Sequence, residues 1–416
     1  MKIAFFAFFV FFSVWSLRPD DVFAQEQGQL PESTLTASEA QNQPNADACS
    51  ALRLDDEPSK SMFQVVVHDQ GRDGICYAEA AAQMTDAFRF GVRKETDYGY
   101  QTAPAVAAIK SSDLATKAKD PFKGGYTCQV IDYIRREGSH DNSIFQSCRK
   151  RLTALKAHQF DSIFDDYQAK IYEKRSQLEA EDSLQKSRKE LHGFAISVAA
   201  QKQSELANCA ASAGSAIPDL TGARAQVMPS LTVLQTYFEQ SRDAFRSEMI
   251  SYACATQDVA VKLPDLPQCH PLRLGSGATA EQLLKKIDDQ FKTHPQLPTA
   301  IGYCDQILRK GRSYSGLEAG NANPASVFCT AENTDENSAT GRHESLIIGR
   351  RRDLKGNCQY LIRNSWGKSC LKKATPKSTE AVSKYSADWE CEEGKGSLWV
   401  DRESLGRSLF EVSYLK

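Results

Sequence analysis

The sequence predicts an α+β protein whose helices come early in the chain and whose strands come late. Apolar residues recur at helical spacing through much of the stretch 145–255. Short runs of apolar and β-branched residues, which are typical of strands, gather after Pro298. No internal repeat is visible that would indicate a solenoid or a propeller.

The composition of the 416 residues is that of an ordinary globular protein. Hydrophobic residues make up 41% and charged residues 25%, so the chain can bury a core, and a disordered or fibrous protein is excluded. Lys and Arg number 51 against 53 Asp and Glu, which gives a net charge of −2. Without an excess of positive charge, nucleic-acid binding has no electrostatic support, and no nucleic-acid partner is expected.

The first 24 residues have the features of a secretory signal peptide. Lys2 supplies a positive charge, and residues 3–15 are apolar except for Ser13. This run is roughly two-thirds of the length that spans a bilayer. Val22 and Ala24 fit a signal-peptidase site with cleavage after Ala24, although an uncleaved anchor is the alternative. We expect a secreted or periplasmic protein that has no membrane association after cleavage.

All twelve cysteines follow the signal peptide. Export leads to an oxidising compartment, where disulfides persist. No Cys-x-x-Cys or His-x-x-x-His pattern occurs, so we expect no metal site, and no cofactor is needed. If one cysteine is kept as a free nucleophile, eleven remain and one of them has no partner. The pairing itself cannot be deduced from the sequence.

The segments ahead of the helical stretch begin with a polar run. Residues 25–60 are rich in Gln, Ser, Pro, Asn and Glu, which predicts a flexible linker. Residues 63–67 form a short strand-like run, and a Gly-containing loop at 69–74 leads into a helix that begins near Cys76. Gly124-Gly125 opens a second helix whose apolar residues fall on one face.

In residues 145–255, Gly and Pro become scarce while charged residues and Gln become abundant. The apolar period is interrupted at 212–222 and then resumes, which predicts a helical hairpin or a small helical subdomain. Another amphipathic helix is expected at 279–292. Strands are expected at 300–303, 345–350, 358–363 and 397–400.

Cys76 is a candidate nucleophile because it lies where a loop gives way to a helix. Backbone N–H groups and the helix dipole favour an anion there, so this position is expected to lower the thiol pKa. The alternative is a structural cysteine, either buried or in a disulfide. Gln70, six residues earlier, is a candidate oxyanion donor if the loop turns its amide back toward Cys76. An ordinary exposed glutamine is the alternative there.

His343 stands out among the seven histidines because Asn364-Ser365-Trp366-Gly367 follows the next predicted strand. An Asn can fix the tautomer of an imidazole, and a neighbouring Trp can exclude water. The nucleophile, the base and the group that orients the base are what an activated thiol requires. The alternatives are a structural histidine and an ordinary turn with a packed Trp.

These residues give the chain a resemblance to the papain family of cysteine proteases. Four segments match family motifs in the family's order: the Gln-Gly-x-x-x-x-Cys-Tyr-Ala run at 70–78, Gly124-Gly125-Tyr126, His343 with its strand, and Asn364-Ser365-Trp366-Gly367. The matching blocks cover about 63–140 and 279–416.

The resemblance implies a role for each matching residue. Cys76 would be the nucleophile, His343 the general base and Asn364 the group that orients it. Gln70 and the N–H of Cys76 would form the oxyanion hole. The remaining assignments concern the substrate: Trp366 would shield the Asn–His bond and line the primed side, while Gly124 and Gly125 would pair with substrate backbone.

The implied fold has two lobes, one helical and one resembling a β-barrel, with an inserted α-helical subdomain. The chain would then divide into a signal peptide (1–24), a flexible linker (25–60), a helical lobe with the nucleophile (61–144), a helical insertion (145–272) and a β-rich lobe with His343 and Asn364 (273–416).

The chain departs from the family in three respects. The positions of one family disulfide are occupied by Asp73 and Phe122, so that this bridge is absent. Cys76 and His343 are 267 positions apart, and the insertion accounts for the excess length. The segment between residue 24 and the catalytic core is too short for the family's long helical propeptide. We therefore expect the helices of 145–255 to cap the cleft or to bind a partner, passive decoration being the alternative.

Three functions are compatible with these residues. The first is an exported cysteine endopeptidase that acts on protein or peptide substrates. The second is another acyl transfer on the same triad, by a transpeptidase or an amidase. The third is a catalytically silent binding module that presents the helical insertion. The intact positions of the triad and of Gln70 favour the first.

Overall fold

The computed structural model describes residues 49–71, 73–115, 120–179, 184–214, 229–255, 260–314, 316–319, 327–329, 341–373 and 380–416. The chain divides into two units, Met1–Pro44 and Asn45–Lys416, and every described residue belongs to the second. The predicted signal peptide at 1–24 and the first part of the predicted linker lie outside the described residues.

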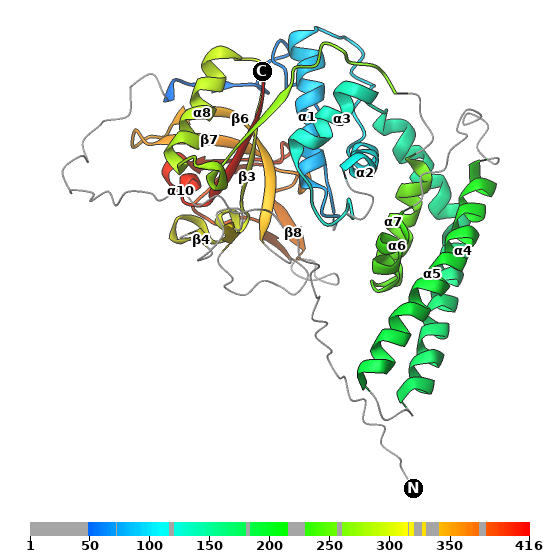
Figure 1. Ribbon diagram of the computed structural model, residues 1–416. Coiled ribbons are helices and arrows are strands. Elements are labelled where there is room, and N and C mark those ends of the chain that lie inside the picture. The colour runs from blue at the N-terminus through cyan, green and yellow to red at the C-terminus, as the bar shows by residue number, and fades with distance from the viewer. Residues whose placement is uncertain are drawn as a thin grey trace, which may run out of the picture. The chain divides into compact units, whose positions relative to one another are not determined.

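The helices concentrate in the first two-thirds of the chain, as the sequence predicts (Figure 1). They are α1 (Cys76–Ala87), α2 (Pro104–Ala115), α3 (Thr127–Glu137), α4 (Asn142–Glu179), α5 (Leu184–Gly214), α6 (Leu231–Phe238), α7 (Arg242–Cys254), α8 (Ala280–Thr293), α9 (Gln306–Lys310) and α10 (Arg402–Gly406).

The strands concentrate in the last third, which confirms the α+β class. They are β1 (Leu52–Arg53), β2 (Cys269–Arg273), β3 (Thr299–Cys304), β4 (Leu317–Ala319), β5 (Val327–Cys329), β6 (Arg342–Arg352), β7 (Cys358–Arg363), β8 (Leu371–Lys373), β9 (Ala381–Ser383), β10 (Glu390–Glu392), β11 (Ser397–Asp401) and β12 (Leu409–Leu415).

The main sheet is antiparallel and has the order β10-β11-β7-β6-β3-β12-β2, with β1 paired to the far end of β6. Its end strands β10 and β2 do not pair with each other in the described part of the chain, so the sheet is open. The β-rich lobe is therefore an open sheet rather than a closed barrel, which fits the predicted two-lobe α+β class. All six residues of β3 and most of β6 are buried, because helices cover both strands.

One face of this sheet is covered by α8 (Figure 1). A capping box of Thr279 and Gln282 starts the helix, and apolar residues at helical spacing, Leu283, Ile287 and Phe291, form its buried face. Asp288 on the same face accepts a hydrogen bond from Tyr360 of β7 at 2.9 Å. The helix predicted at 279–292 is thus confirmed to within one residue.

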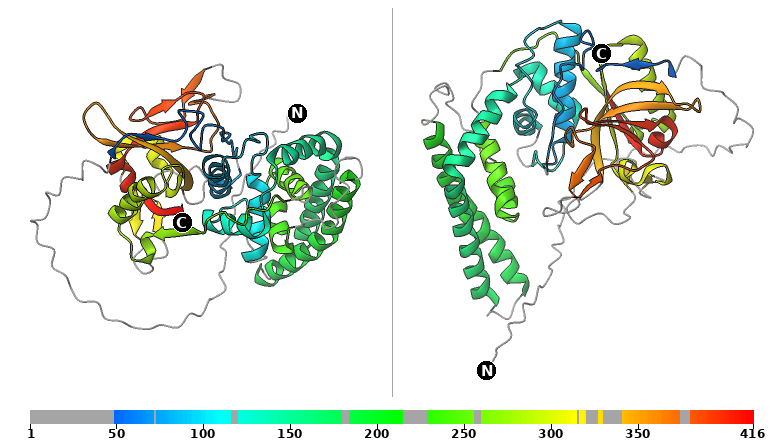
Figure 2. Two further views of the ribbon diagram at one scale, coloured as in Figure 1. Left: turned by 90° about the horizontal axis from the view of Figure 1, so that it is seen from above. Right: turned by 180° about the vertical axis from the view of Figure 1, so that it is seen from behind.

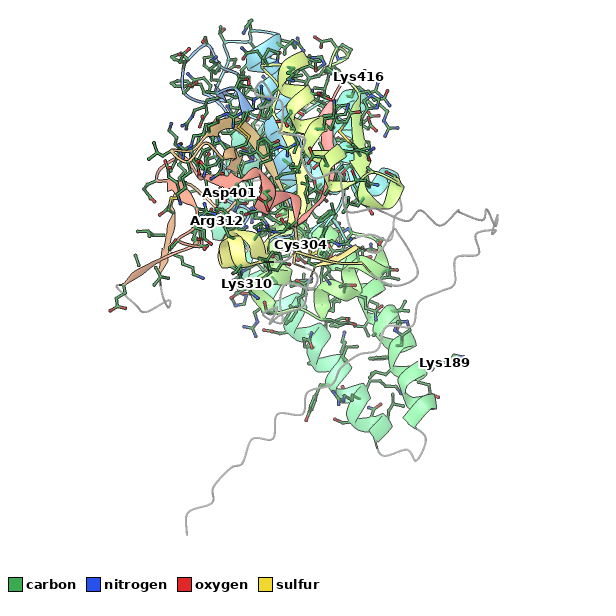
Figure 3. The ribbon with its side chains drawn as sticks, turned by 90° about the vertical axis from the view of Figure 1, so that its left-hand side faces the viewer. Lys189, Cys304, Lys310, Arg312, Asp401 and Lys416 are labelled. Atoms are coloured by element: carbon green, nitrogen blue, oxygen red, sulfur yellow. A yellow bond between two sulfur atoms is a disulfide. The ribbon has the colours of Figure 1, made fainter. Side chains whose placement is uncertain are left out.

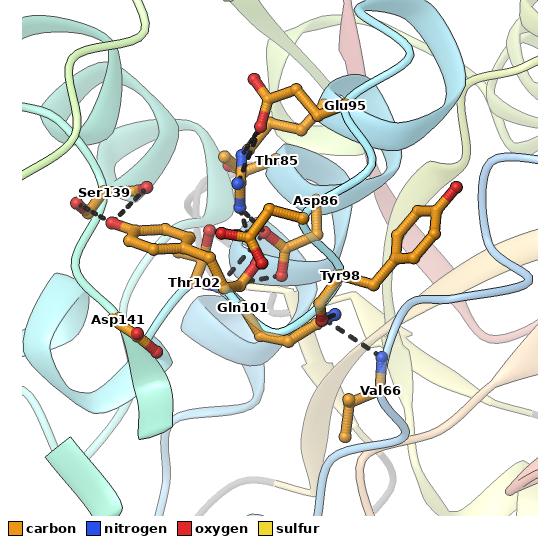
Figure 4. A network of polar contacts seen from close by, with 12 residues as sticks. Val66, Thr85, Asp86, Glu95, Tyr98, Gln101, Thr102, Ser139 and Asp141 are labelled. Atoms are coloured by element: carbon orange, nitrogen blue, oxygen red, sulfur yellow. Dashed lines mark hydrogen bonds and ion pairs between the residues drawn. The ribbon is translucent and has the colours of Figure 1, made fainter. Parts of the chain in front are cut away.

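Three helices, α1, α2 and α3, pack together and form the helical lobe, and α1 also contacts β6 and β3. Alanine side chains on α1 allow close approach on several sides. A buried polar network fixes the far end of α1, where Asp86 accepts three bonds from Thr102 and one from Arg89 (Figure 4). Charge-assisted hydrogen bonds are strong when they are buried. These bonds therefore fix the positions of Thr102 and Arg89 against the end of α1.

The helical stretch consists of α4 to α7. α4 and α5 run alongside each other, as Figure 2 shows, and α7 packs on α4. Aromatic side chains fill the space between them: the ring of Phe238 lies 3.9 Å from that of Tyr167 and 4.7 Å from that of Phe245. The stretch is helical, as the sequence predicts, but its long hairpin is not the predicted one: α4 ends at Glu179 and α5 begins at Leu184, whereas the sequence indicated the interruption at 212–222.

Five disulfides connect the described residues: Cys49–Cys358, Cys128–Cys269, Cys148–Cys254, Cys304–Cys329 and Cys370–Cys391. Cys76 and Cys209 take part in none of these five disulfides, so the prediction that one cysteine besides the candidate nucleophile lies outside the bridges is confirmed. Polar contacts add to the bridges in the sheet region, where Arg312 forms an ion pair with Asp401 (Figure 3). No helix among the described ranges is long and apolar enough to cross a bilayer.

Two sequence-based expectations need correction, and one helix was not predicted. The linker predicted at 25–60 is too long, because Cys49 is disulfide-bonded to Cys358 and β1 pairs with β6. Residues 63–67 are not a strand, because no strand of the described residues forms β-pairing hydrogen bonds with them. The backbone there forms bends and irregular structure. α2 was not predicted at all, because its Ala- and Ser-rich sequence carries only a weak amphipathic signal.

Candidate active site

Cys76 is the first residue of α1, is half-buried and is not disulfide-bonded. The loop before it is held by a close backbone contact. The N–H of Gly74 donates to the carbonyl of Phe122 at 2.9 Å, and a Cβ on Gly74 would come within 2.4 Å of that oxygen. Only glycine allows this approach, so Gly74 fixes the loop that ends at Cys76.

His343 lies near the start of β6, opposite Tyr303 of β3. Its side chain is buried, with the edge of the Tyr303 ring at 5.7 Å on one side and the Trp366 ring at 5.2 Å on another. Because α1 packs against β6 and β3, the helix that carries Cys76 and the strand that carries His343 are in contact.

Asn364 follows β7 and is fully buried. Its Oδ1 accepts from Nε2 of His343 at 2.7 Å, from the N–H of Ser365 at 2.8 Å and from the hydroxyl of Ser345 at 3.3 Å. Since an amide oxygen only accepts, Nε2 of His343 must carry the hydrogen. Nδ1 is then the nitrogen that can take up a proton, which is the state that a general base requires.

Trp366 lies beside the imidazole of His343, with ring centres 5.2 Å apart. Its ring stacks on Tyr385 at 5.8 Å, and the Arg309 guanidinium lies 5.0 Å from its centre. The backbone of Trp366 forms a bridge with Asp69, so the Asn-Ser-Trp-Gly segment and the loop before Cys76 are joined.

Gln70 lies at this junction. Its side-chain N–H donates to the carbonyl of Asp73 at 2.9 Å, while its Oε1 accepts from the hydroxyl of Ser365. Its backbone N–H donates to the carbonyl of Ser365 at 2.9 Å. The side-chain amide of Gln70 is therefore held in one orientation. Its second N–H remains available to donate a hydrogen bond to a substrate oxygen.

Gly124 and Gly125 lie in the loop that touches the residue after Cys76. Gly124 has a positive φ of 102° and open space beside it. A Cβ on Gly125 would meet the ring of Tyr77 at 2.3 Å, so the absence of a side chain lets this loop lie directly against the start of α1. The hydroxyl of Thr127 completes the contact by donating to the carbonyl of Tyr77 at 3.1 Å.

The electrostatic surroundings oppose one expectation from the sequence. Burial, and after it the negative charge of Glu344, raise the pKa of the Cys76 thiol to about 12, although the N–H groups of Glu344 and Tyr77 counteract part of the effect. The position at the start of a helix was expected to lower it. Burial also lowers the pKa of His343 to about 4, although the hydrogen bond that His343 donates to Asn364 acts in the opposite direction.

The resting pair at neutral pH is consequently a thiol and a neutral imidazole. Among the hydrogen bonds of the described residues, none joins the sulfur of Cys76 to His343. The structure thus brings His343, Asn364 and Trp366 together by direct contacts and joins Gln70 to this group through Ser365. Cys76 is placed near the group by the packing of α1 against β6 and β3.

Glu344 is a feature of the site that sequence reasoning missed. It follows His343 on β6 and is buried, and one of its carboxylate oxygens accepts from the hydroxyl of Thr127. Burial, followed by the charge of Glu411, raises the pKa of Glu344. A charged residue close to the apolar run Leu346-Ile347-Ile348 was the available signal.

No set of three His, Cys, Asp or Glu side chains within the described ranges is placed to hold a metal ion. The sequence matches no protein-family model, and the search of curated proteins gives no match.

Several solved structures are similar to the chain. One is the ragweed pollen cysteine protease Amb a 11 in its proform, with 10% identity, a TM-score of 0.37 and coverage of 91% of this chain and 66% of that one. Digestive procathepsin L 3 from the larval midgut of Tenebrio molitor has 12% identity, a TM-score of 0.35 and coverage of 89% and 74%. The bromelain protease of Ananas comosus, solved with the E64 inhibitor, has 11% identity, a TM-score of 0.33 and coverage of 85% and 94%.

Proposed function

We propose that this chain is an exported papain-like cysteine peptidase that hydrolyses peptide bonds with Cys76 as nucleophile, His343 as general base and Asn364 as the group that orients His343. The observation that carries the proposal is the 2.7 Å bond from Nε2 of His343 to Oδ1 of Asn364. This bond selects the tautomer whose Nδ1 can accept the proton of a thiol.

In the proposed first step, the thiol proton passes to Nδ1 of His343 while the sulfur bonds to the carbonyl carbon of the peptide. The carbonyl electron pair moves onto the oxygen, which the free N–H of Gln70 and the N–H of Cys76 stabilise. Collapse of this tetrahedral species breaks the C–N bond. The departing amine takes the proton from His343 and leaves a thioester on Cys76.

Water then completes the reaction. His343 removes a proton from water as the oxygen attacks the thioester carbonyl, and the proton returns to the sulfur when the acid product leaves. Because the resting pair is neutral, the proton moves with the attack rather than before it. The reaction needs no metal or cofactor.

Substrates in this proposal are proteins or peptides that bind in extended form. Gly124 and Gly125 would pair with substrate backbone on the non-primed side, since a segment without side chains offers its N–H and C=O groups. Trp366, which is half-exposed beside His343, would line the primed side.

Export is part of the proposal. The predicted signal peptide would direct the chain out of the cytosol, and five disulfides are typical of proteins that fold in an oxidising compartment. Both the extracellular space and a periplasm satisfy this condition. N-terminal sequencing of the exported protein tests it, because cleavage after Ala24 predicts a mature chain that begins at Gln25.

The activity is tested with a tagged epoxysuccinyl probe on the mature protein under mild reductant. We expect one labelled residue, Cys76, and loss of labelling in Cys76→Ala and in His343→Ala. Labelling of a correctly folded His343→Ala protein at the wild-type rate would contradict an assembled pair. Incubation of cleaved peptides with an amine acceptor separates hydrolysis from transpeptidation.

A second candidate is a catalytically silent binding protein. One observation favours it: the raised pKa of Cys76 and the lowered pKa of His343 hold the pair neutral, without a hydrogen bond between them. A folded protein that resists the probe both with and without a bound peptide would support this candidate.

A further inference from the structure

A hollow of about 610 Å³ lies between the loop that leads to Cys76 and the helices α4 and α7. Gln70, Asp73 and Glu79 line it from the catalytic lobe, and Arg149 and Glu248 line it from the helical stretch. This volume is within the range of small-molecule sites and exceeds what one side chain requires. The helices 145–255 thus build one wall of a pocket whose other wall is the candidate oxyanion loop.

Glu248 of α7 is the unusual group in this pocket. Its residue is only 7% exposed, and its Oε2 has no hydrogen-bond partner in the described part of the chain. A buried carboxylate without a counter-charge costs several kcal/mol, so such groups are normally paired. Burial raises the pKa of Glu248 to about 9, and Asp120 and Asp73 add to the effect.

The other acidic groups of the lining already have partners. Glu79 is paired with His68, and Asp243 with Arg246. Asp69, Asp73 and Glu248 remain, and Arg149 is the one cation among the lining residues. Arg149 also donates to the hydroxyl of Ser247 at 3.0 Å. The pocket lining therefore has more acidic than basic side chains, and only a hydrogen bond from Gln240 and the charge of Lys123, which is outside the lining, favour the ionised form of Glu248. A cation bound opposite Glu248 would favour that form further.

We propose that this pocket binds the cationic side chain of an Arg or Lys residue of the peptide substrate, with Glu248 as its principal partner. The inference rests on the proposed function, since it names the substrate class of that site. Gln70 and Asp73 belong both to the pocket wall and to the loop before Cys76, so the pocket adjoins the loop that ends at the candidate nucleophile. The helical stretch would then be a specificity element.

The first test measures binding without turnover. Calorimetry on the mature Cys76→Ala protein compares N-acetyl-arginine amide with N-acetyl-citrulline amide, which has nearly the same shape but no charge. We expect the arginine amide to bind about tenfold more tightly or better, and Glu248→Gln to reduce that preference by a similar factor. Glu173→Gln, an exposed glutamate of α4 away from the pocket, is the matched control and should retain the preference.

Equal binding of the two amides, or a preference that survives Glu248→Gln, would overturn the proposal. Gln preserves the size of Glu, and thermal unfolding of the Glu248→Gln variant checks that the fold is intact. Asp73→Asn is a second variant that should also reduce the preference for the arginine amide. These outcomes do not depend on turnover, so they are separate from a failure of the proposed peptidase activity.

The second test asks whether the occupant is the substrate. Peptide pairs that differ only in Arg against citrulline are cleaved by the wild-type protein and by Glu248→Gln. We expect a kcat/KM ratio in favour of Arg of about tenfold or more in the wild type, and a ratio near one in the variant. Binding of the free amide together with equal cleavage of the two peptides would contradict a substrate site and would instead indicate a site for free cations.

Discussion

Glu344 is the residue whose charge acts most directly on the candidate nucleophile. Its carboxyl group is buried beside the start of α1, and its negative charge is the largest contribution after burial to the raised pKa of Cys76. The hydroxyl of Thr127 and the charge of Arg273 favour the ionised carboxylate, which opposes the effect of burial on Glu344 itself. The reactivity of the thiol is therefore coupled to a neighbour that the sequence motifs do not include.

Glu344→Gln is expected to lower the pKa of the Cys76 thiol, because a negative charge that disfavours the thiolate is removed. The rate of Cys76 alkylation by iodoacetamide should then rise at a lower pH than in the wild type. The difference should be clearest above the pKa of Glu344, where the wild-type carboxylate is charged. Glu403→Gln on the surface of α10 serves as control, and an alkylation profile that stays in place in Glu344→Gln would exclude the coupling.

Asn364→Ala removes the oxygen that accepts from His343, Ser345 and Ser365. The imidazole loses its fixed orientation, so kcat/KM for a peptide should fall about tenfold to a hundredfold. Ser345→Ala deletes one weaker bond to the same oxygen and should cost less. If both variants lose activity equally, Asn364 acts through general packing rather than through His343.

At this scale the sequence could predict that His343 and Asn364 are paired, and the structure joins them by a hydrogen bond, because their order and spacing follow from the motif. It could not predict Glu344 or Glu248. The effect of each depends on burial and on which charges lie opposite, and those are set by segments far away in the chain.

At the scale of elements, the helical stretch is attached to the catalytic lobe at Phe122. The ring of Phe122 meets those of Tyr237 and Tyr252 edge to face, at 6.4 and 6.1 Å. The hydroxyl of Tyr237 donates to Asp120 at 2.7 Å. This aromatic packing and the bond from the N–H of Gly74 to the carbonyl of Phe122 hold the loop around Phe122 against the helical stretch and against the segment before Cys76.

Phe122→Ala is expected to destabilise the protein by about 3 kcal/mol or more, because it removes a buried ring and leaves a cavity between two elements. Hydrogen exchange should become faster in the loop 120–123 and in the part of α7 around Tyr252, which shows the loss of docking directly. Phe63→Ala, at a side chain that is 41% exposed, is the control. Protection of α7 that is unchanged in Phe122→Ala would show that α7 docks by other contacts.

Elements with a strong period were predictable, as α8 and β6 show. β1 was not, because its two residues, Leu52 and Arg53, carry no pattern and become a strand only through pairing with Gly349 and Arg350. Residues 63–67 show the opposite case: they have strand propensity but no partner. In both cases, whether a segment forms a strand depends on pairing with residues far away in the sequence. Local propensity contains no information about that pairing.

At the scale of the whole molecule, buried acids govern how stability depends on pH. Their pKa values are raised, chiefly by burial: Asp73, Asp86, Asp120, Glu248, Asp288, Asp305 and Glu344. His68, paired with Glu79, is also raised. Asp55 and Glu392 are lowered and act in the opposite direction, as does the lowered pKa of His343.

The sign follows from which state binds more protons. A group whose pKa is higher in the folded state contributes stability below its unfolded pKa, and this contribution is lost as the pH rises through the folded value. For the buried acids the loss begins above about pH 4 and, for Glu248, extends to about pH 9. Below pH 6 His343 opposes this trend, since its imidazole must stay neutral in the folded state.

We therefore expect the melting temperature to be higher at pH 5.5 than at pH 8.5, by at least about 3 °C, because the buried carboxyl groups of Glu344 and Glu248, whose pKa values are raised to about 8 and about 9, lose stability across that interval. Asp55 and Glu392, whose pKa values are lowered, are ionised in both states throughout it and do not offset the loss. Scanning calorimetry at constant ionic strength measures it. Glu248→Gln, which mimics the neutral acid, should melt higher than the wild type at pH 8.5 and show a flatter pH profile, whereas Glu173→Gln should follow the wild type. A melting temperature that rises from pH 5.5 to pH 8.5 would contradict this expectation. It would mean that these carboxyl groups are ionised and stabilised in the folded protein, and that Glu248 is paired with a cation of its own chain.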